Sequence, residues 1–174
     1  PDGDQGYPGA LDVEVTYTLT EDNAVRIDYR GVPQADTYIN MTNHSYFNLN
    51  GHASGSVLNH TVWLDADSFT RADAASIPTG EILAVEGTPM DFRTPKALNR
   101  DIGEDYEPLR LQAGYDHNWE VFCAPCAILT DPESGREMAV HTDCPGVQLY
   151  AGNFLNEVGK GGTVYGKRTG IALE

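Results

Sequence analysis

Apolar and polar residues alternate with a period of two along most of the chain, a pattern typical of β-strands. From Leu11 to Leu19 every odd-numbered residue is apolar and every even-numbered one is polar, which predicts a half-buried strand. A polar turn at residues 20–23 is followed by renewed alternation at 25–30, which predicts a hairpin. Further strands are predicted at residues 37–41, 61–65, 81–86, 118–122, 127–130, 136–141 and 147–151.

Turn-forming residues separate these predicted strands, and no segment carries a helical stripe of apolar residues with capping residues at its ends. The 18 glycines and 10 prolines lie mostly between the strands, as an all-β architecture with many short connections requires. A length of 174 residues suits one domain and allows a sizeable core. We therefore predict one all-β domain over residues 1–174, an antiparallel β-sandwich or barrel.

Charge and cysteine content narrow the range of partners. With 26 acidic and 11 basic residues, the chain has a formal net charge of −15. Such a field repels nucleic acid, anionic lipid and phosphorylated ligands, so a neutral small molecule is the expected partner. Three cysteines cannot form a complete disulfide framework, and no signal peptide or membrane-spanning run is recognisable, so we expect a cytoplasmic protein.

One set of residues has the composition of a Cys₃His zinc site: Cys123, Cys126, His141 and Cys144. The turn at residues 131–135 would bring its two pairs together. On a strand, however, residues three apart point to opposite faces, so each pair is split unless a bulge, for example at Pro125, intervenes. We expect a hairpin with buried thiols and no bound metal.

Four segments carry more polarity than plain strands or loops need: residues 40–49, 114–118, 144–150 and 170–174. The first places His44 among amides, hydroxyls and aromatic rings, which suits a core histidine and the wall of a polar-ligand pocket equally well. The other three carry Asp116, Gln148 and Glu174. A turn aspartate, an outward glutamine and a surface glutamate would explain these residues without any function.

Taken together, seven blocks resemble the galactose mutarotase (aldose 1-epimerase) family, in the same order and from end to end of the chain. They are PDGDQGYPG at 1–9, TNHSYFNL at 42–49, IPTG at 77–80, MDFR at 90–93, GYDHN at 114–118, PGVQLY at 145–150 and LE at 173–174. The resemblance implies a β-supersandwich, of which this chain is the C-terminal portion of the catalytic domain. Family members have an earlier segment with an arginine and a further histidine in the cleft, and more strands after the position of Glu174. We therefore expect a native protein that is longer at both ends.

The resemblance also implies an isomerase that interconverts the α and β anomers of a free hexose such as galactose or glucose, without a metal or organic cofactor. His44 matches the general acid and Glu174 the general base. The residues that match the sugar-binding positions are His44, Ser45, Tyr46, Asp116 and Gln148.

Three other functions stay open from the sequence. A non-catalytic carbohydrate-binding β-sandwich needs aromatic and amide side chains but no acid–base pair, so it would tolerate the loss of His44 or Glu174. An epimerase for phosphorylated hexoses should show a basic cluster for the phosphate, and the 11 basic residues are scattered. An inactive relative that has lost the N-terminal half is the third. The preferred hexose and the oligomeric state are not determined by the sequence.

Overall fold

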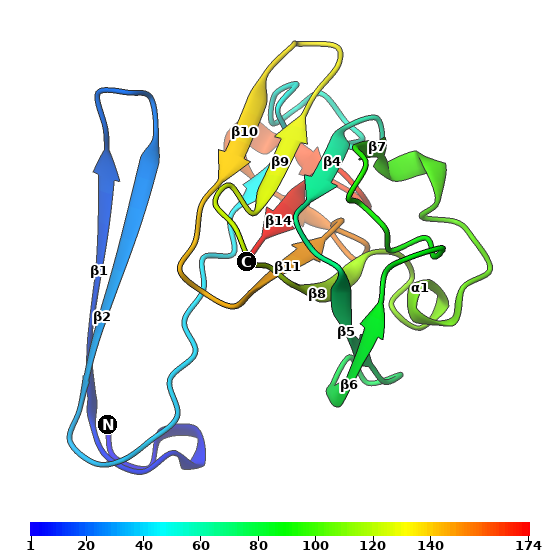
Figure 1. Cartoon of the computed structure of the whole chain (residues 1–174). Helices are drawn as coiled ribbons and strands as arrows, with labels where there is room; N and C mark the ends of the chain where they lie inside the picture. The colour runs from blue at the N-terminus through cyan, green and yellow to red at the C-terminus, as the bar shows by residue number, and fades with distance from the viewer. The chain divides into compact units, whose positions relative to one another are not determined.

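The computed structural model describes all 174 residues, which form two compact units, Pro1–Thr42 and Asn43–Glu174 (Figure 1). The position of one unit relative to the other is not determined, so the single domain predicted from the sequence stays a prediction. Every strand pairing in both units is antiparallel. The predicted all-β, antiparallel fold class is thereby confirmed.

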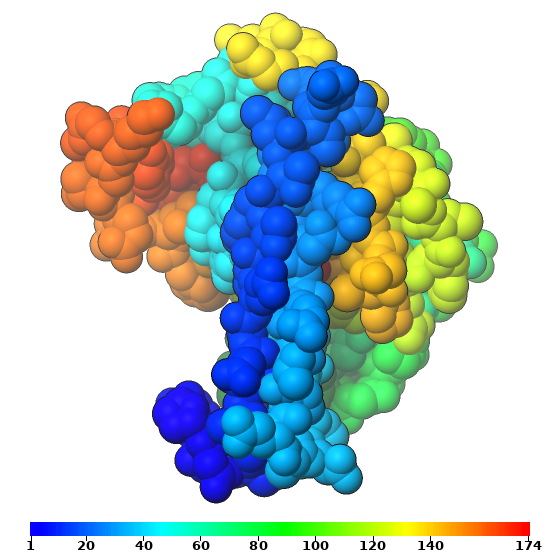
Figure 2. Space-filling view, turned by 90° about the vertical axis from the view of Figure 1, so that its left-hand side faces the viewer, coloured from blue at the N-terminus to red at the C-terminus, as the bar shows by residue number.

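The first unit is a long hairpin. After a 3₁₀ turn, η1 (Asp4–Gly6), β1 (Leu11–Leu19) pairs with β2 (Val25–Pro33) in an unbroken register, and the two strands lie side by side over their whole length (Figures 1 and 2). The hairpin is as predicted, although β2 extends three residues beyond the predicted end at residue 30. The predicted half-burial of β1 is wrong, since Tyr17 and Leu19 are 61% and 80% exposed. A two-stranded hairpin has no second layer to cover its apolar face.

The second unit contains two larger sheets. The four-stranded sheet has the order β10 (Glu137–Val140), β9 (Ala127–Thr130), β4 (Thr61–Leu64) and β7 (Lys96–Ala97). The six-stranded sheet has the order β3 (Tyr46–Phe47), β14 (Ile171–Leu173), β11 (Gly146–Tyr150), β8 (Asp116–Glu120), β5 (Ser68–Ala72) and β6 (Pro78–Ala84). The remaining elements are the pair β12 (Glu157–Val158) and β13 (Val164–Tyr165), the helix α1 (Glu107–Leu111), and the 3₁₀ turns η2 (Leu98–Arg100) and η3 (Lys160–Gly162). None of the helices is long and apolar enough to cross a membrane.

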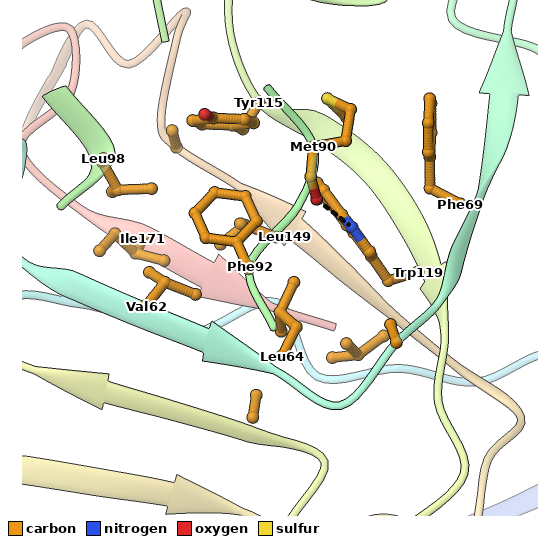
Figure 3. Close-up of a cluster of buried hydrophobic side chains, with 14 of the residues drawn as sticks. Val62, Leu64, Phe69, Met90, Phe92, Leu98, Tyr115, Trp119, Leu149 and Ile171 are labelled. Atoms are coloured by element: carbon orange, nitrogen blue, oxygen red, sulfur yellow. Dashed lines mark hydrogen bonds between the residues drawn. The ribbon is translucent and has the colours of Figure 1, made fainter. Parts of the chain in front are cut away.

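The core lies between these two sheets. Both contribute to one cluster of buried apolar side chains, with Val62 and Leu64 from β4 and with Trp119, Leu149 and Ile171 from the six-stranded sheet (Figure 3). The indole N–H of the fully buried Trp119 donates to a main-chain carbonyl 3.1 Å away, so the largest core side chain leaves no donor unpaired (Figure 3). Since alternate residues of a strand point to opposite faces, the residues between these core positions point away from the core.

Two predictions about local structure are wrong. Residues 37–41 form no strand, because their alternating pattern finds no neighbouring strand with which to pair. In the predicted hairpin β9–β10, Cys126 is buried, with its Sγ 3.4 Å from the Val140 carbonyl, but Cys123 and Cys144 are exposed. These two thiols lie in bends outside the strands, where alternation directs no side chain into the core. No group of three or more His, Cys, Asp and Glu side chains is placed to hold a metal ion, and the absence of zinc stays a prediction.

Candidate active site

The two residues matched to the acid and the base lie in contact. Glu174 directly follows β14, and its backbone exchanges two hydrogen bonds with Gln148, of 2.8 and 2.9 Å. His44 lies two residues before β3, which pairs with β14 through Tyr46 and Ala172. As a result, Nε2 of His44 is 3.2 Å from Oε1 of Glu174. The Glu174 side chain is only 15% exposed, whereas that of His44 is half exposed.

The two residues matched to sugar hydroxyls form a second polar pair on the same sheet. Gln148 lies on β11 between core residues Val147 and Leu149, so its side chain points away from the core. Its Nε2 donates to Oδ1 of Asp116, on the adjacent strand β8, at 2.8 Å. The backbone pairing of Gln148 with Glu174 places the two polar pairs beside one another, so Asp116 interacts electrostatically with both His44 and Glu174.

Two tyrosine rings lie against the His44 ring. The His44 ring centroid is 4.9 Å from that of Tyr46 and 6.1 Å from that of Tyr150, and the two tyrosine rings are also 6.1 Å apart. Tyr150 was not predicted as a site residue. Its spacing could have identified it, because it follows Gln148 by two positions on β11 and therefore faces the same way. The Tyr150 Oη accepts the Phe154 N–H at 3.0 Å, which leaves its hydroxyl hydrogen available to a ligand.

Ser45 is the one predicted residue that this geometry does not bring to the cluster. It is exposed, and its backbone N–H donates to the side-chain oxygen of Asn43 at 3.1 Å. The rings of its two neighbours, His44 and Tyr46, lie on the same side with their centroids 4.9 Å apart, as expected for residues two apart in extended chain. A role of the Ser45 hydroxyl in sugar binding therefore stays a prediction.

Burial sets the electrostatics of the carboxylates. Partial burial raises the pKa of Glu174, with His44 opposing the shift and the negative charge of Asp116 adding to it. Burial also raises the pKa of Asp116, against the lowering effects of the Gln148 hydrogen bond and of His44. A carboxylate with a raised pKa is a stronger base than an exposed one. Glu174 is thus better suited than an exposed glutamate to accept a proton.

A hollow of about 50 Å³ lies next to the polar pair. Its lining comes from β5, β6, β8, β11 and the connection between β5 and β6: Thr70, Ala72, Ser76, Pro78, Asp116, His117, Asn118 and Gln148. Within it, the Asn118 amide donates to the Thr70 hydroxyl at 3.1 Å. The polar surface beside Asp116 therefore extends across the sheet from β8 to β5 and β6, on the side remote from β14.

Comparison with known proteins gives one consistent result. The family model described as aldose 1-epimerase matches residues 1–174. The galactose mutarotase of Homo sapiens is 43% identical over 183 residues, which cover all of this chain and 51% of the human protein. The aldose 1-epimerase of Haemophilus influenzae is 42% identical over 178 residues, which cover 99% of this chain and 52% of that protein.

The solved structures agree with these sequence matches. A crystal structure of galactose 1-epimerase from Lactobacillus acidophilus superposes with a TM-score of 0.87 at 30% identity, over 99% of this chain and 50% of that one. This chain thus spans about half the length of the relatives that it matches. Because the family model matches every residue, the chain belongs to the aldose 1-epimerase family, as its sequence motifs indicated.

Proposed function

We propose that the protein is a mutarotase, an isomerase that interconverts the α and β anomers of a free hexose such as galactose or glucose. The observation that carries the proposal is the 3.2 Å approach of His44 Nε2 to Glu174 Oε1, beside a carboxylate–amide pair suited to hydroxyl groups. The names of its relatives, galactose mutarotase and aldose 1-epimerase, support it.

Mutarotation opens a hemiacetal ring and closes it on the other face of C1. Ring opening removes the proton of the C1 hydroxyl and delivers a proton to the ring oxygen. Either transfer alone would place a full charge on an oxygen atom, so an acid and a base are needed together. Glu174 takes the first proton and protonated His44 gives the second, and each positioned group typically contributes about 10²–10⁴-fold. Ring closure uses the same pair with the roles exchanged.

Between opening and closure the aldehyde must turn about the C1–C2 bond. The site must therefore hold the remote hydroxyls while C1 stays loose. Asp116 accepts hydroxyl protons, and Gln148 both donates and accepts, so this pair suits the remote hydroxyls. The rings of Tyr46 and Tyr150 suit an apolar face of the sugar. A non-catalytic binding module would use these same groups but has no need of the acid–base pair.

Polarimetry of freshly dissolved α-D-galactose tests the proposal, with the spontaneous reaction subtracted. The wild-type chain should accelerate the change in rotation, and His44→Asn should lower kcat by about 100-fold or more with little change in KM. His141→Asn, which removes an exposed histidine, is the matched control and should behave as wild type. Galactose binding without acceleration by the wild-type chain would favour the binding module. An unchanged kcat in His44→Asn would remove the proposed acid.

A further inference from the structure

The strand next to the acid is short and lies at a sheet edge. β3 has only two residues and pairs with β14 alone, through Phe47 with Ile171 and Tyr46 with Ala172. A slip of one residue in such a pairing would turn every side chain to the opposite face. Two paired positions are too few to fix the register of β3 against β14. The position of His44 against Glu174 therefore depends on anchors outside the sheet.

The backbone of Leu49, two residues beyond β3, is such an anchor. Its N–H donates to Nε2 of His60 at 3.0 Å. Its carbonyl accepts hydrogen bonds from the Arg136 guanidinium at 2.8 Å and from the Ser134 hydroxyl at 3.1 Å. Both backbone polar groups of Leu49 are thus held by side chains that are remote in the sequence.

The hydrogen bond to Leu49 determines the tautomer of His60. A ring nitrogen that accepts a hydrogen bond carries no proton, so the proton of the neutral ring is on Nδ1. Burial lowers the pKa of His60, which favours the neutral ring. Nδ1 is buried without a hydrogen-bond partner, 4.0 Å from Oδ1 of Asp131, and both side chains are 3% exposed or less. That distance is too long for a hydrogen bond, but a proton on Nδ1 is attracted by the nearby carboxylate, which favours this tautomer.

Asp131 belongs to the same turn that holds the Leu49 carbonyl. It begins the turn between β9 and β10, and its carboxylate accepts the backbone N–H of Ser134 at 2.8 Å. The same turn supplies the Ser134 and Arg136 groups that hold the Leu49 carbonyl. One turn therefore places a carboxylate 4.0 Å from His60 Nδ1 and also binds the Leu49 carbonyl directly.

We infer that His60 is a positioning residue for the proposed reaction: as the Nδ1–H tautomer beside Asp131, it holds the Leu49 N–H and thereby keeps His44 in register with Glu174. His60 touches neither the acid nor the base and acts only through the chain between them. The effect of His60 on activity rests on the proposed function. The hydrogen bond between His60 and Leu49 does not depend on it.

The first test measures the tautomer in the wild-type chain by long-range ¹H–¹⁵N correlation of the histidine rings. The spectrum should show a protonated Nδ1 and an unprotonated Nε2 for His60. The opposite tautomer would overturn the inference, because a protonated Nε2 cannot accept the Leu49 N–H. This measurement requires no variant and no activity.

The second test compares two substitutions of His60 by polarimetry. His60→Gln places an amide oxygen near the position of Nε2 and can still accept the Leu49 N–H, whereas His60→Leu cannot. We expect His60→Leu to lower kcat by about 10- to 100-fold with KM changed by less than about threefold, because misplacement of the acid affects the chemical step. His60→Gln should recover most of the lost kcat, and His141→Leu, an exposed matched control, should resemble wild type. A wild-type kcat in His60→Leu, or equal losses in both His60 variants, would overturn the inference.

NMR separates failure of this inference from failure of the proposed function. If the wild-type chain does not accelerate mutarotation, the proposed function fails for this chain. Slow exchange of the Leu49 amide hydrogen and the His44 ring-proton shifts caused by the nearby Tyr46 ring still report the positioning. Both should persist in His60→Gln and be lost in a folded His60→Leu. If they persist in folded His60→Leu, or are lost in both variants, His60 does not position His44. If His60→Leu does not fold, persistence in His60→Gln supports the role and loss there rejects it.

Discussion

Replacement of Glu174 by glutamine removes the proposed base with little change in shape. The backbone hydrogen bonds of residue 174 to Gln148 involve main-chain atoms only and should persist. The amide oxygen can still face His44 across the 3.2 Å contact. What is lost is the capacity to accept a proton from the C1 hydroxyl, and Asp116 and Gln148 remain in place to bind the sugar.

Glu174→Gln should lower the activity of the protein but should not lower its stability. A positioned base contributes about 10²–10⁴-fold, so kcat of Glu174→Gln should fall by about that factor, equal to about 3–5 kcal/mol of transition-state stabilisation. Burial raises the pKa of Glu174 above its ordinary value of 4.5. An acid with a raised folded-state pKa stabilises the fold most when protonated, and this contribution is lost as pH rises through that pKa. At neutral pH the glutamine variant should therefore unfold at the same temperature as wild type or higher.

Polarimetry across the titration range of carboxylates and imidazoles, together with thermal unfolding, measures both effects. For the wild-type chain, kcat/KM should fall as the pH is lowered through the Glu174 pKa, on the acid side of a bell-shaped profile. Glu157→Gln, a change at an exposed glutamate, is the matched control and should leave kcat and the unfolding temperature unchanged. A folded Glu174→Gln variant with wild-type kcat would refute the assignment of the base. A marked fall in its unfolding temperature would refute the reasoning about burial.

Three further predictions concern sugar binding, the core and the cysteines. Asp116→Asn should raise KM by about tenfold or more with little change in kcat, because a hydrogen bond to a charged group contributes about 1.5–3 kcal/mol; a loss confined to kcat, measured by polarimetry, would contradict this. Trp119→Ala should lower the free energy of unfolding by about 3–5 kcal/mol in urea titration, since it leaves a cavity in the core, whereas Phe122→Ala should cost about 0.5 kcal/mol or less; the Phe122 side chain is 71% exposed. Metal analysis of protein purified without chelator should find no zinc at Cys123, Cys126, His141 and Cys144. About one zinc per chain that is lost on Cys126→Ser would contradict this and would show that the four side chains converge.

Of the strands with four or more residues, all but β5 were predicted from the sequence. Ala127–Thr130 is predicted residue for residue, and the predictions for β4, β8 and β11 differ from the structure by at most two residues at either end. The strands β3, β7, β12, β13 and β14 have two or three residues, too few for a period-two signal, and exist because a partner strand lies beside them. The missed β5 has five residues, and its pairing with β6 contains a register shift.

The site could be predicted in part. The resemblance identified His44, Glu174, Asp116 and Gln148, which the structure brings together. The contact between the first two depends on the pairing of β3 with β14, which has too few residues to be read from a pattern. His60 could not be recognised in advance, because its importance comes from a hydrogen bond to a peptide group rather than from a motif.

The most direct test of the central claim is magnetisation exchange between the α and β anomeric protons of galactose at equilibrium, measured by NMR with this chain and with the double variant His44→Asn/Glu174→Gln. Exchange should be much faster with the wild-type chain than in buffer. The double variant should bind galactose but fall to the buffer rate, because the acid and the base are both absent. Equal exchange rates with wild-type chain and buffer, despite demonstrated galactose binding, would show that this chain binds the sugar without catalysing mutarotation.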